Sequence, residues 1–116
     1  MTLIKDKTAL DKTYVETPPE IIDFLIESIR HVAKKNFGKD LEDPDVKILD
    51  PFAGKGEFFV RGFETGKLNN RMNLEAWELS DERHTAMLHN FREKNIKAKT
   101  RHIDTLATDP NDLKGP

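Results

Sequence analysis

The amino-acid sequence predicts an α/β fold with a parallel sheet of three strands. Three short apolar or alternating stretches are typical of strands, and helical patterns separate them. The links between these elements are short, which favours right-handed crossovers and therefore parallel strands. Ligands of such sheets bind beyond the carboxyl ends of the strands. An acidic residue stands at or beside each of these ends: Asp50, Glu78 and Asp104.

The chain begins with an arm, Met1 to Glu16, that has no sustained apolar period and is predicted to be extended. A helix is predicted next, because Thr17 can cap it, Pro18 suits its first position and Glu20 completes a capping box. Gly38 indicates where this helix ends. Apolar residues recur along it at helical spacing: Ile22, Leu25, Ile29 and Val32.

Strands and helices then alternate. The apolar run Val46 to Asp50 predicts the first strand, and Glu57 to Glu64 predicts a short helix. Residues 74–78 predict the second strand. Asp81 is predicted to cap a helix that extends to about Lys94. Residues 97–103 alternate weakly and predict the third strand.

A glycine loop connects the first strand to the helix after it, with the sequence Asp50-Pro51-Phe52-Ala53-Gly54-Lys55-Gly56. Glycines in this position let the backbone approach a ligand where any Cβ would collide. The loop lacks the spacing and the Ser or Thr of a phosphate-binding P-loop, and Phe59 replaces the third glycine of a dinucleotide fingerprint. The carboxylate of Asp50 would repel a pyrophosphate but attract an ammonium or sulfonium group. The loop therefore predicts a cationic small-molecule ligand, with a simple tight turn as the alternative.

The acids after the second and third strands each allow a ligand-binding interpretation and one without a ligand. Glu78 follows Gly56 by 22 residues, where an acid can accept hydrogen bonds from both ribose hydroxyls of a ligand. Alternatively, Glu78 is a solvated acid before the next helix. Asp104 either contacts the ligand, pairs with Arg101 or His102, or caps the turn that follows. These alternatives stay open at the level of the sequence.

Composition narrows the function classes further. The chain has 116 residues, enough for one domain at most, and its 19 Lys and Arg against 21 Asp and Glu give no electrostatic footprint for nucleic acid. Cysteine is absent and the four histidines share no metal-binding spacing, so no metal site is predicted. No signal peptide is recognisable, and no apolar stretch approaches the ~20 residues of a membrane span. We expect a soluble, cytoplasmic chain.

Together these segments resemble the cofactor-binding part of adenine-N6 DNA methyltransferases of restriction–modification systems. The resemblance spans about residues 14–110 and implies a Rossmann-like methyltransferase fold with strand order 3-2-1 and S-adenosyl-L-methionine as cofactor. Residues 17–116 would form an incomplete S-adenosylmethionine-binding domain behind the arm at 1–16. The matching segments, in order, are Thr17-Pro18-Pro19-Glu20, Asp50-Pro51-Phe52-x-Gly54-x-Gly56, Glu78 and Asp104.

The resemblance implies roles for residues at the methionine end of the cofactor. Thr17 and Pro18 would border the methionine moiety, and Asp50 would face its ammonium group. Gly54 and Gly56 would admit the cofactor closely.

At the nucleoside end, the resemblance implies that Glu78 would hold the ribose hydroxyls and that Leu79 would lie against the adenine ring. Asp104 would accept a hydrogen bond from the adenine amino group. Phe52, within the loop motif, is counted with these cofactor-binding residues.

One feature of the resembled family is absent from the 116 residues: the catalytic tetrapeptide Asn-Pro-Pro-Tyr or Asp-Pro-Pro-Tyr, which would grip a flipped target adenine. We therefore expect no catalytic residue in this chain, no activity from it alone, and a fold truncated before the later strands. DNA would be contacted only through missing parts of a parent protein or through a partner subunit. The first strand would then be exposed, so we expect self-association through it or coverage of it by the arm.

Two other function classes stay open. A NAD-type dinucleotide-binding domain is disfavoured by Asp50, by Phe59 and by the lack of a hydride-transfer residue. A non-catalytic interaction module would keep the scaffold without binding a cofactor.

Overall fold

The computed structural model describes residues 15–104 and residue 106. Most of the predicted arm, and the residues from 107 onward, lie outside this described part. Its elements, in chain order, are α2 (Pro19–Phe37), β1 (Lys47–Asp50), α3 (Glu57–Glu64), β2 (Asn73–Trp77), α4 (Asp81–Glu93) and β3 (Lys99–Arg101).

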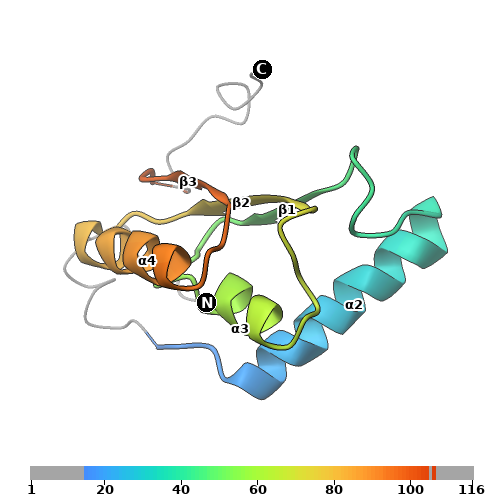
Figure 1. Cartoon of the computed structure of the whole chain (residues 1–116), viewed down its shortest axis with the longest axis horizontal. Helices are drawn as coiled ribbons and strands as arrows, with labels where there is room; N and C mark the ends of the chain where they lie inside the picture. The colour runs from blue at the N-terminus through green and yellow to red at the C-terminus, as the bar shows by residue number, and fades with distance from the viewer. Residues whose placement is uncertain (1–14, 105, 107–116) are drawn as a thin grey trace.

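The three strands form one parallel sheet in the order β1-β2-β3 (Figure 1). Ile48 pairs with Leu74, and Ala76 pairs with Thr100. The predicted α/β class and strand order are confirmed. The third strand is shorter than predicted, because the Lys97 N–H donates to the Asn70 side chain at 2.8 Å instead of joining the ladder.

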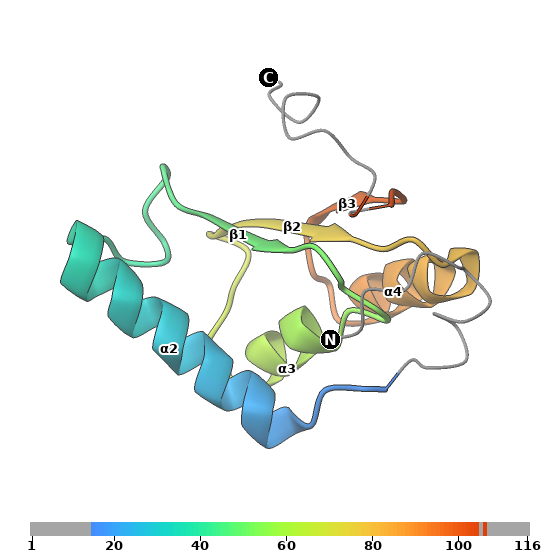
Figure 2. The ribbon, with the colours of Figure 1, turned by 180° about the vertical axis from the view of Figure 1, so that it is seen from behind.

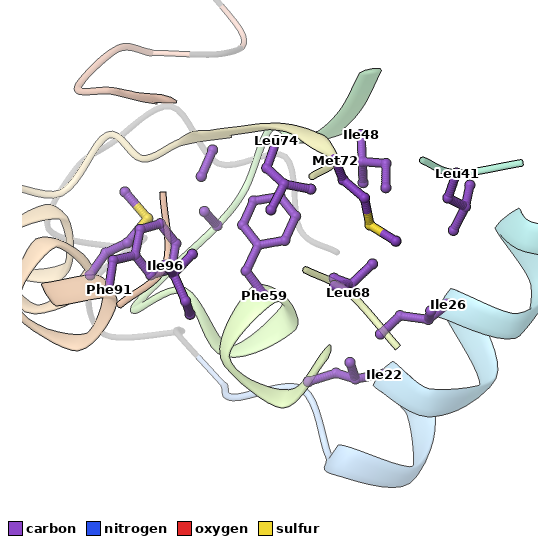
Figure 3. Packing of buried hydrophobic residues seen from close by; sticks show 13 residues of the cluster. Ile22, Ile26, Leu41, Ile48, Phe59, Leu68, Met72, Leu74, Phe91 and Ile96 are labelled. Carbon is purple, nitrogen blue, oxygen red and sulfur yellow. The ribbon is translucent and has the colours of Figure 1, made fainter. Parts of the chain in front are cut away.

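The helices of the described residues, α2, α3 and α4, all lie on one side of the sheet, as the two opposite views in Figures 1 and 2 show. The hydrophobic core fills the space between these helices and the sheet. Phe59 of α3 is fully buried at its centre, below Leu74 of β2 (Figure 3). α2 contributes Ile22 and Ile26, which are buried at exposed fractions of 2% and 0%, so the inward stripe of this helix is narrower than its apolar pattern suggested.

The predicted capping box of α2 is wrong. The helix begins at Pro19, its N-cap is Pro18, and no side chain caps it. The carbonyl oxygen of Pro18 accepts from the N–H groups of Ile21 and Ile22, both at 3.1 Å. Because Pro19 occupies the first helical position, Thr17 stands one residue too early to cap it. The predicted end at Gly38 is confirmed, since this residue has φ 66° in the left-handed region.

The predicted cap of α4 is also wrong by one residue. Ser80 has an extended backbone, and its hydroxyl accepts from the Arg83 N–H at 3.3 Å. Asp81 is instead the first helical residue, where its charge favours the helix N-terminus. Ser and Asp are comparable caps, so residue type alone could not separate the two positions.

The outer edge of β1 has no strand partner within the part of the chain that is described. Beside it, a groove of about 740 Å³ runs between α2 and β1, with Leu25, Ile29 and Val46 among its lining residues. The predicted self-association through this strand stays a prediction. None of the described helices combines the length and apolar content that a membrane crossing requires.

Candidate functional site

The glycine loop leaves β1 and enters α3 through two residues with left-handed backbones, Gly54 at φ 60° and Gly56 at φ 84°. A Cβ on Gly56 would lie 2.5 Å from a ring carbon of Phe91 in α4. Positive φ and this close packing therefore both require glycine at residue 56. The loop is also fastened to β2, because the Ala53 N–H donates to the Trp77 carbonyl oxygen at 2.9 Å.

Glu78 connects the end of β2 to this loop. Its Oε1 accepts from the Gly54 N–H at 2.7 Å, and its Oε2 accepts from the Ser80 N–H at 2.8 Å. The guanidinium of Arg83 in α4 forms an ion pair with the same Oε2 at 3.3 Å. Glu78 is only 6% exposed, which excludes the interpretation of this residue as a solvated acid.

Asp50 lies at the start of the loop, half-buried, and its Oδ1 accepts from the Phe52 N–H at 3.1 Å. Burial raises the pKa of Asp50 to about 6; the Phe52 hydrogen bond opposes this rise, and the charges of Glu57 and Glu78 add to it. The carboxylates of Glu57 and Glu78 are therefore close enough to Asp50 to add to the rise of its pKa. A site with this excess of negative charge is suited to a cation.

The segment before α2 approaches the same loop. Oε1 of Glu16 lies 3.9 Å from the Nζ of Lys55 in the glycine loop. Thr17 and Pro18 follow directly and are exposed. α2 is held against α3 by Asp23, whose two carboxylate oxygens accept from Arg61 at 2.9 and 2.8 Å.

At the other end of the site, Asp104 accepts from the Leu106 N–H at 3.0 Å, which is the turn-capping arrangement considered from the sequence. His102 approaches Leu79 instead, with its Nε2 2.8 Å from the Leu79 carbonyl oxygen. Arg101 donates through Nε to Glu75 at 2.9 Å. Leu79 is partly buried, whereas Phe52, within the glycine loop, is 43% exposed.

Sequence reasoning missed two residues of this site. Arg83 pairs with Glu78 from the first turn of α4, and Asn90 donates through Nδ2 to the Lys55 carbonyl oxygen at 3.0 Å. Neither residue belongs to a motif. Only the position of Arg83, in the first turn of the helix that follows the acid after β2, would have drawn attention to it.

Comparison with known proteins places this geometry in context. No family model matches the sequence, and no curated protein does. Solved structures do match. One is a putative class I S-adenosylmethionine-dependent methyltransferase from Listeria monocytogenes, with a TM-score of 0.62 and 19% identity over 86% of this chain. The chain has a methyltransferase-like fold.

Two further matches are to proteins in complexes with DNA. DrdV bound to DNA matches 78% of this chain with a TM-score of 0.66 and 26% identity. LlaBIII, an ATP-dependent Type ISP restriction–modification enzyme bound to DNA, matches 70% with a TM-score of 0.55 and 33% identity. The resemblance to a methyltransferase-like region of restriction–modification enzymes is confirmed at the level of structure. The chain spans 10% of the DrdV chain, 6% of LlaBIII and 31% of the Listeria protein.

Proposed function

We propose that this chain binds S-adenosyl-L-methionine at the glycine loop, as the cofactor-binding part of a DNA adenine-N6 methyltransferase. The observation that carries the proposal is the convergence of Asp50, Glu57 and Glu78 on one loop of a methyltransferase-like fold. The sulfonium and ammonium of S-adenosylmethionine outweigh its single carboxylate. A loop on which three carboxylates converge therefore fits this ligand; burial raises the pKa of Asp50, and the charges of Glu57 and Glu78 add to that rise.

The proposed roles follow the chain. Asp50 faces the ammonium group, and its charged form is favoured when that cation arrives. Thr17 and Pro18 are proposed to border the methionine moiety, and the approach of the preceding residue, Glu16, to within 3.9 Å of Lys55 supports this.

Glu78 is proposed to accept the ribose hydroxyls, and Leu79 to lie against adenine. Asp104, whose Oδ1 accepts from the Leu106 N–H, is proposed to accept from the adenine amino group when the cofactor binds. Phe52 offers an exposed apolar ring within the loop. These assignments rest on the resemblance and are supported by the positions of Asp50, Glu78 and Asp104 at or after the ends of the three strands.

Methyl transfer itself, from the cofactor to the exocyclic nitrogen of a DNA adenine, is proposed for the protein of which such a region forms part. The role proposed for these 116 residues is to hold the cofactor. DNA contacts are proposed to come from other parts of that protein or from a partner subunit.

A NAD-type site is the competing function, and the acidic loop disfavours it, because a pyrophosphate next to Asp50 and Glu57 would be repelled. Isothermal titration calorimetry with S-adenosylmethionine, S-adenosylhomocysteine and NAD separates the two. We expect heat from the first two ligands only. Preferential binding of NAD, or binding of none of the three, would overturn the proposal.

Matched variants locate the site in the same experiment. Asp50→Asn and Glu78→Gln remove loop carboxylates, whereas Glu82→Gln removes an exposed acid from the first turn of α4. We expect the first two to weaken binding and the third to leave it unchanged. Equal effects of all three variants would mean that general charge, rather than this site, attracts the ligand.

A further inference from the structure

The acceptor capacity of Glu78 is almost fully used within the protein. A carboxylate offers about four lone-pair positions, two on each oxygen. The Gly54 N–H occupies one position on Oε1, and the Ser80 N–H occupies one on Oε2. Nε and Nη2 of Arg83 both lie 3.3 Å from the same Oε2. Oε2 is therefore saturated, and Oε1 has room for one more donor.

The three donors to Glu78 are not held equally. The two backbone N–H groups are 2.7 and 2.8 Å from the carboxylate, the usual range for charge-assisted bonds. Both contacts of Arg83 are longer, at 3.3 Å, although the side chains are buried at exposed fractions of 11% and 7%. The backbone donors are fixed by the loop and by the cap of α4, whereas a guanidinium sits at the end of a flexible stem. Arg83 is thus the donor that can leave.

A ribose presents two neighbouring hydroxyls, and an acid that recognises both needs two acceptor positions. One hydroxyl can use the open position on Oε1. The second needs the position on Oε2 that Arg83 occupies. A ligand with one hydroxyl makes no such demand.

We propose that Arg83 is a displaceable positioning residue that competes with the ribose diol of the cofactor for Glu78. This inference rests on the proposed function. Without ligand, Arg83 compensates the buried carboxylate and keeps it aimed at Gly54. When a diol binds, the hydroxyls replace Arg83 on Oε2. Arg83 thereby limits how strongly the site distinguishes a ribose from a deoxyribose.

The test compares the wild type with Arg83→Met, which keeps an apolar stem of similar length but cannot donate a hydrogen bond. Calorimetry measures S-adenosylhomocysteine and its 2′-deoxy analogue on both proteins. Because the competing donor is gone, we expect Arg83→Met to bind S-adenosylhomocysteine roughly three- to tenfold more tightly. The 2′-deoxy analogue should change little, so the ratio of the two dissociation constants rises. Arg83→Lys keeps the charge without the planar fork. Its affinity for S-adenosylhomocysteine should lie between those of the wild type and Arg83→Met.

Thermal unfolding gives an independent readout on the same proteins. Arg83→Met should have a lower melting temperature than the wild type without ligand, because a buried carboxylate loses its cation. The increase in melting temperature caused by S-adenosylhomocysteine should nevertheless be larger than in the wild type. A residue with a merely structural role would lower both quantities.

A third measurement needs no variant. The Nε–H resonance of Arg83 in the wild type should shift on addition of S-adenosylhomocysteine and stay in place with the 2′-deoxy analogue. An unchanged resonance with both ligands, or an Arg83→Met protein that binds both ligands equally weakly, would overturn the inference. If the wild type binds neither ligand, the proposed cofactor site itself fails, which is a separate result.

Discussion

Glu78 and Gly54 are joined by a hydrogen bond of 2.7 Å between the carboxylate Oε1 and the backbone N–H, although they are 24 residues apart. The bond ties the end of β2 to the loop that follows β1. A residue expected to bind a ligand therefore also shapes the loop that would receive it. Changes at this residue should alter stability and binding together.

Glu78→Gln tests this double role. A glutamine has one acceptor oxygen, so it cannot accept from both Gly54 and Ser80, and one buried donor loses its partner. We expect the free energy of unfolding to fall by about 1–3 kcal/mol and the affinity for S-adenosylhomocysteine to fall at least tenfold. Chemical denaturation and calorimetry measure the two effects. Full binding by this variant would show that the ribose is held elsewhere.

Asp50→Asn should separate stability from binding. The pKa of Asp50 is raised from 3.8 to about 6 on folding, so this group contributes stability below pH 3.8 that is lost as pH rises through about 6. Above both pKa values the charged carboxylate lowers the free energy of unfolding by on the order of 3 kcal/mol. Asparagine removes this cost. We expect Asp50→Asn to be more stable than the wild type at pH 7 and to bind S-adenosylhomocysteine more weakly. A less stable variant at pH 7 would contradict this.

The affinity of the wild type should itself depend on pH through the same residue. Asp50 must be ionised to hold an ammonium group, so binding of S-adenosylhomocysteine should weaken as pH falls from 7 to 5, through the pKa of about 6. In Asp50→Asn this slope should vanish. Calorimetry at three pH values measures it, and parallel slopes in the two proteins would assign the titration to another group.

Gly56→Ala should destabilise the protein through both strain and collision. The new Cβ would lie 2.5 Å from the Phe91 ring at a residue with φ 84°. Gly66→Ala is the matched control, because Gly66 has φ 72° but nothing within 4 Å of the added Cβ. We expect Gly66→Ala to lower the free energy of unfolding by about 1 kcal/mol. Gly56→Ala should lower it by roughly 1–3 kcal/mol more. Equal losses would mean that Phe91 moves aside freely.

Glu75 should control the stability of the protein in acid. Burial alone would raise the pKa of Glu75, but hydrogen bonds from Lys47, Trp77 and Arg101 outweigh it and lower the pKa to about 2. Because this value lies below the ordinary 4.5, the stabilisation is complete above pH 4.5 and is lost as pH falls toward 2. The free energy of unfolding of Glu75→Gln at pH 7 should therefore be on the order of 3 kcal/mol lower than that of the wild type. Its stability should also depend less on pH in acid.

The control for this prediction is Glu64→Gln, which removes an exposed ion pair with Lys94 at 3.4 Å. Exposed pairs contribute about 0–1 kcal/mol, so little change is expected. Denaturation curves between pH 2 and pH 7 compare the two variants. A Glu75→Gln protein as stable as Glu64→Gln would show that the buried network contributes no net stability.

Much of the fold could be predicted from local patterns, because the strands and helices differ in period and the connecting loops are short. The boundaries were less accurate where chemically similar residues compete, as Ser80 and Asp81 do for the cap of α4. The acids at the strand ends were also predictable, since parallel strands present their carboxyl ends at one edge. The sequence could not predict that Glu78 is buried and that donors of the protein already occupy its Oε2. Its partners, Gly54 and Arg83, come from a loop and a helix that only the folded chain brings together.

The network around Glu75 also bears on how the sheet assembles. Lys47 of β1 and Arg101 of β3 reach the same carboxylate of β2, at 2.7 and 2.9 Å, on the face opposite Ile48 and Leu74. Because side chains alternate along a strand, slipping β3 by one residue would turn Arg101 toward the apolar core and leave Glu75 without it. A chain with this wrong register would thus bury the charge of Arg101 in the apolar core and leave the buried charge of Glu75 without that partner. The carboxylate therefore favours the observed strand register over one shifted by a single residue.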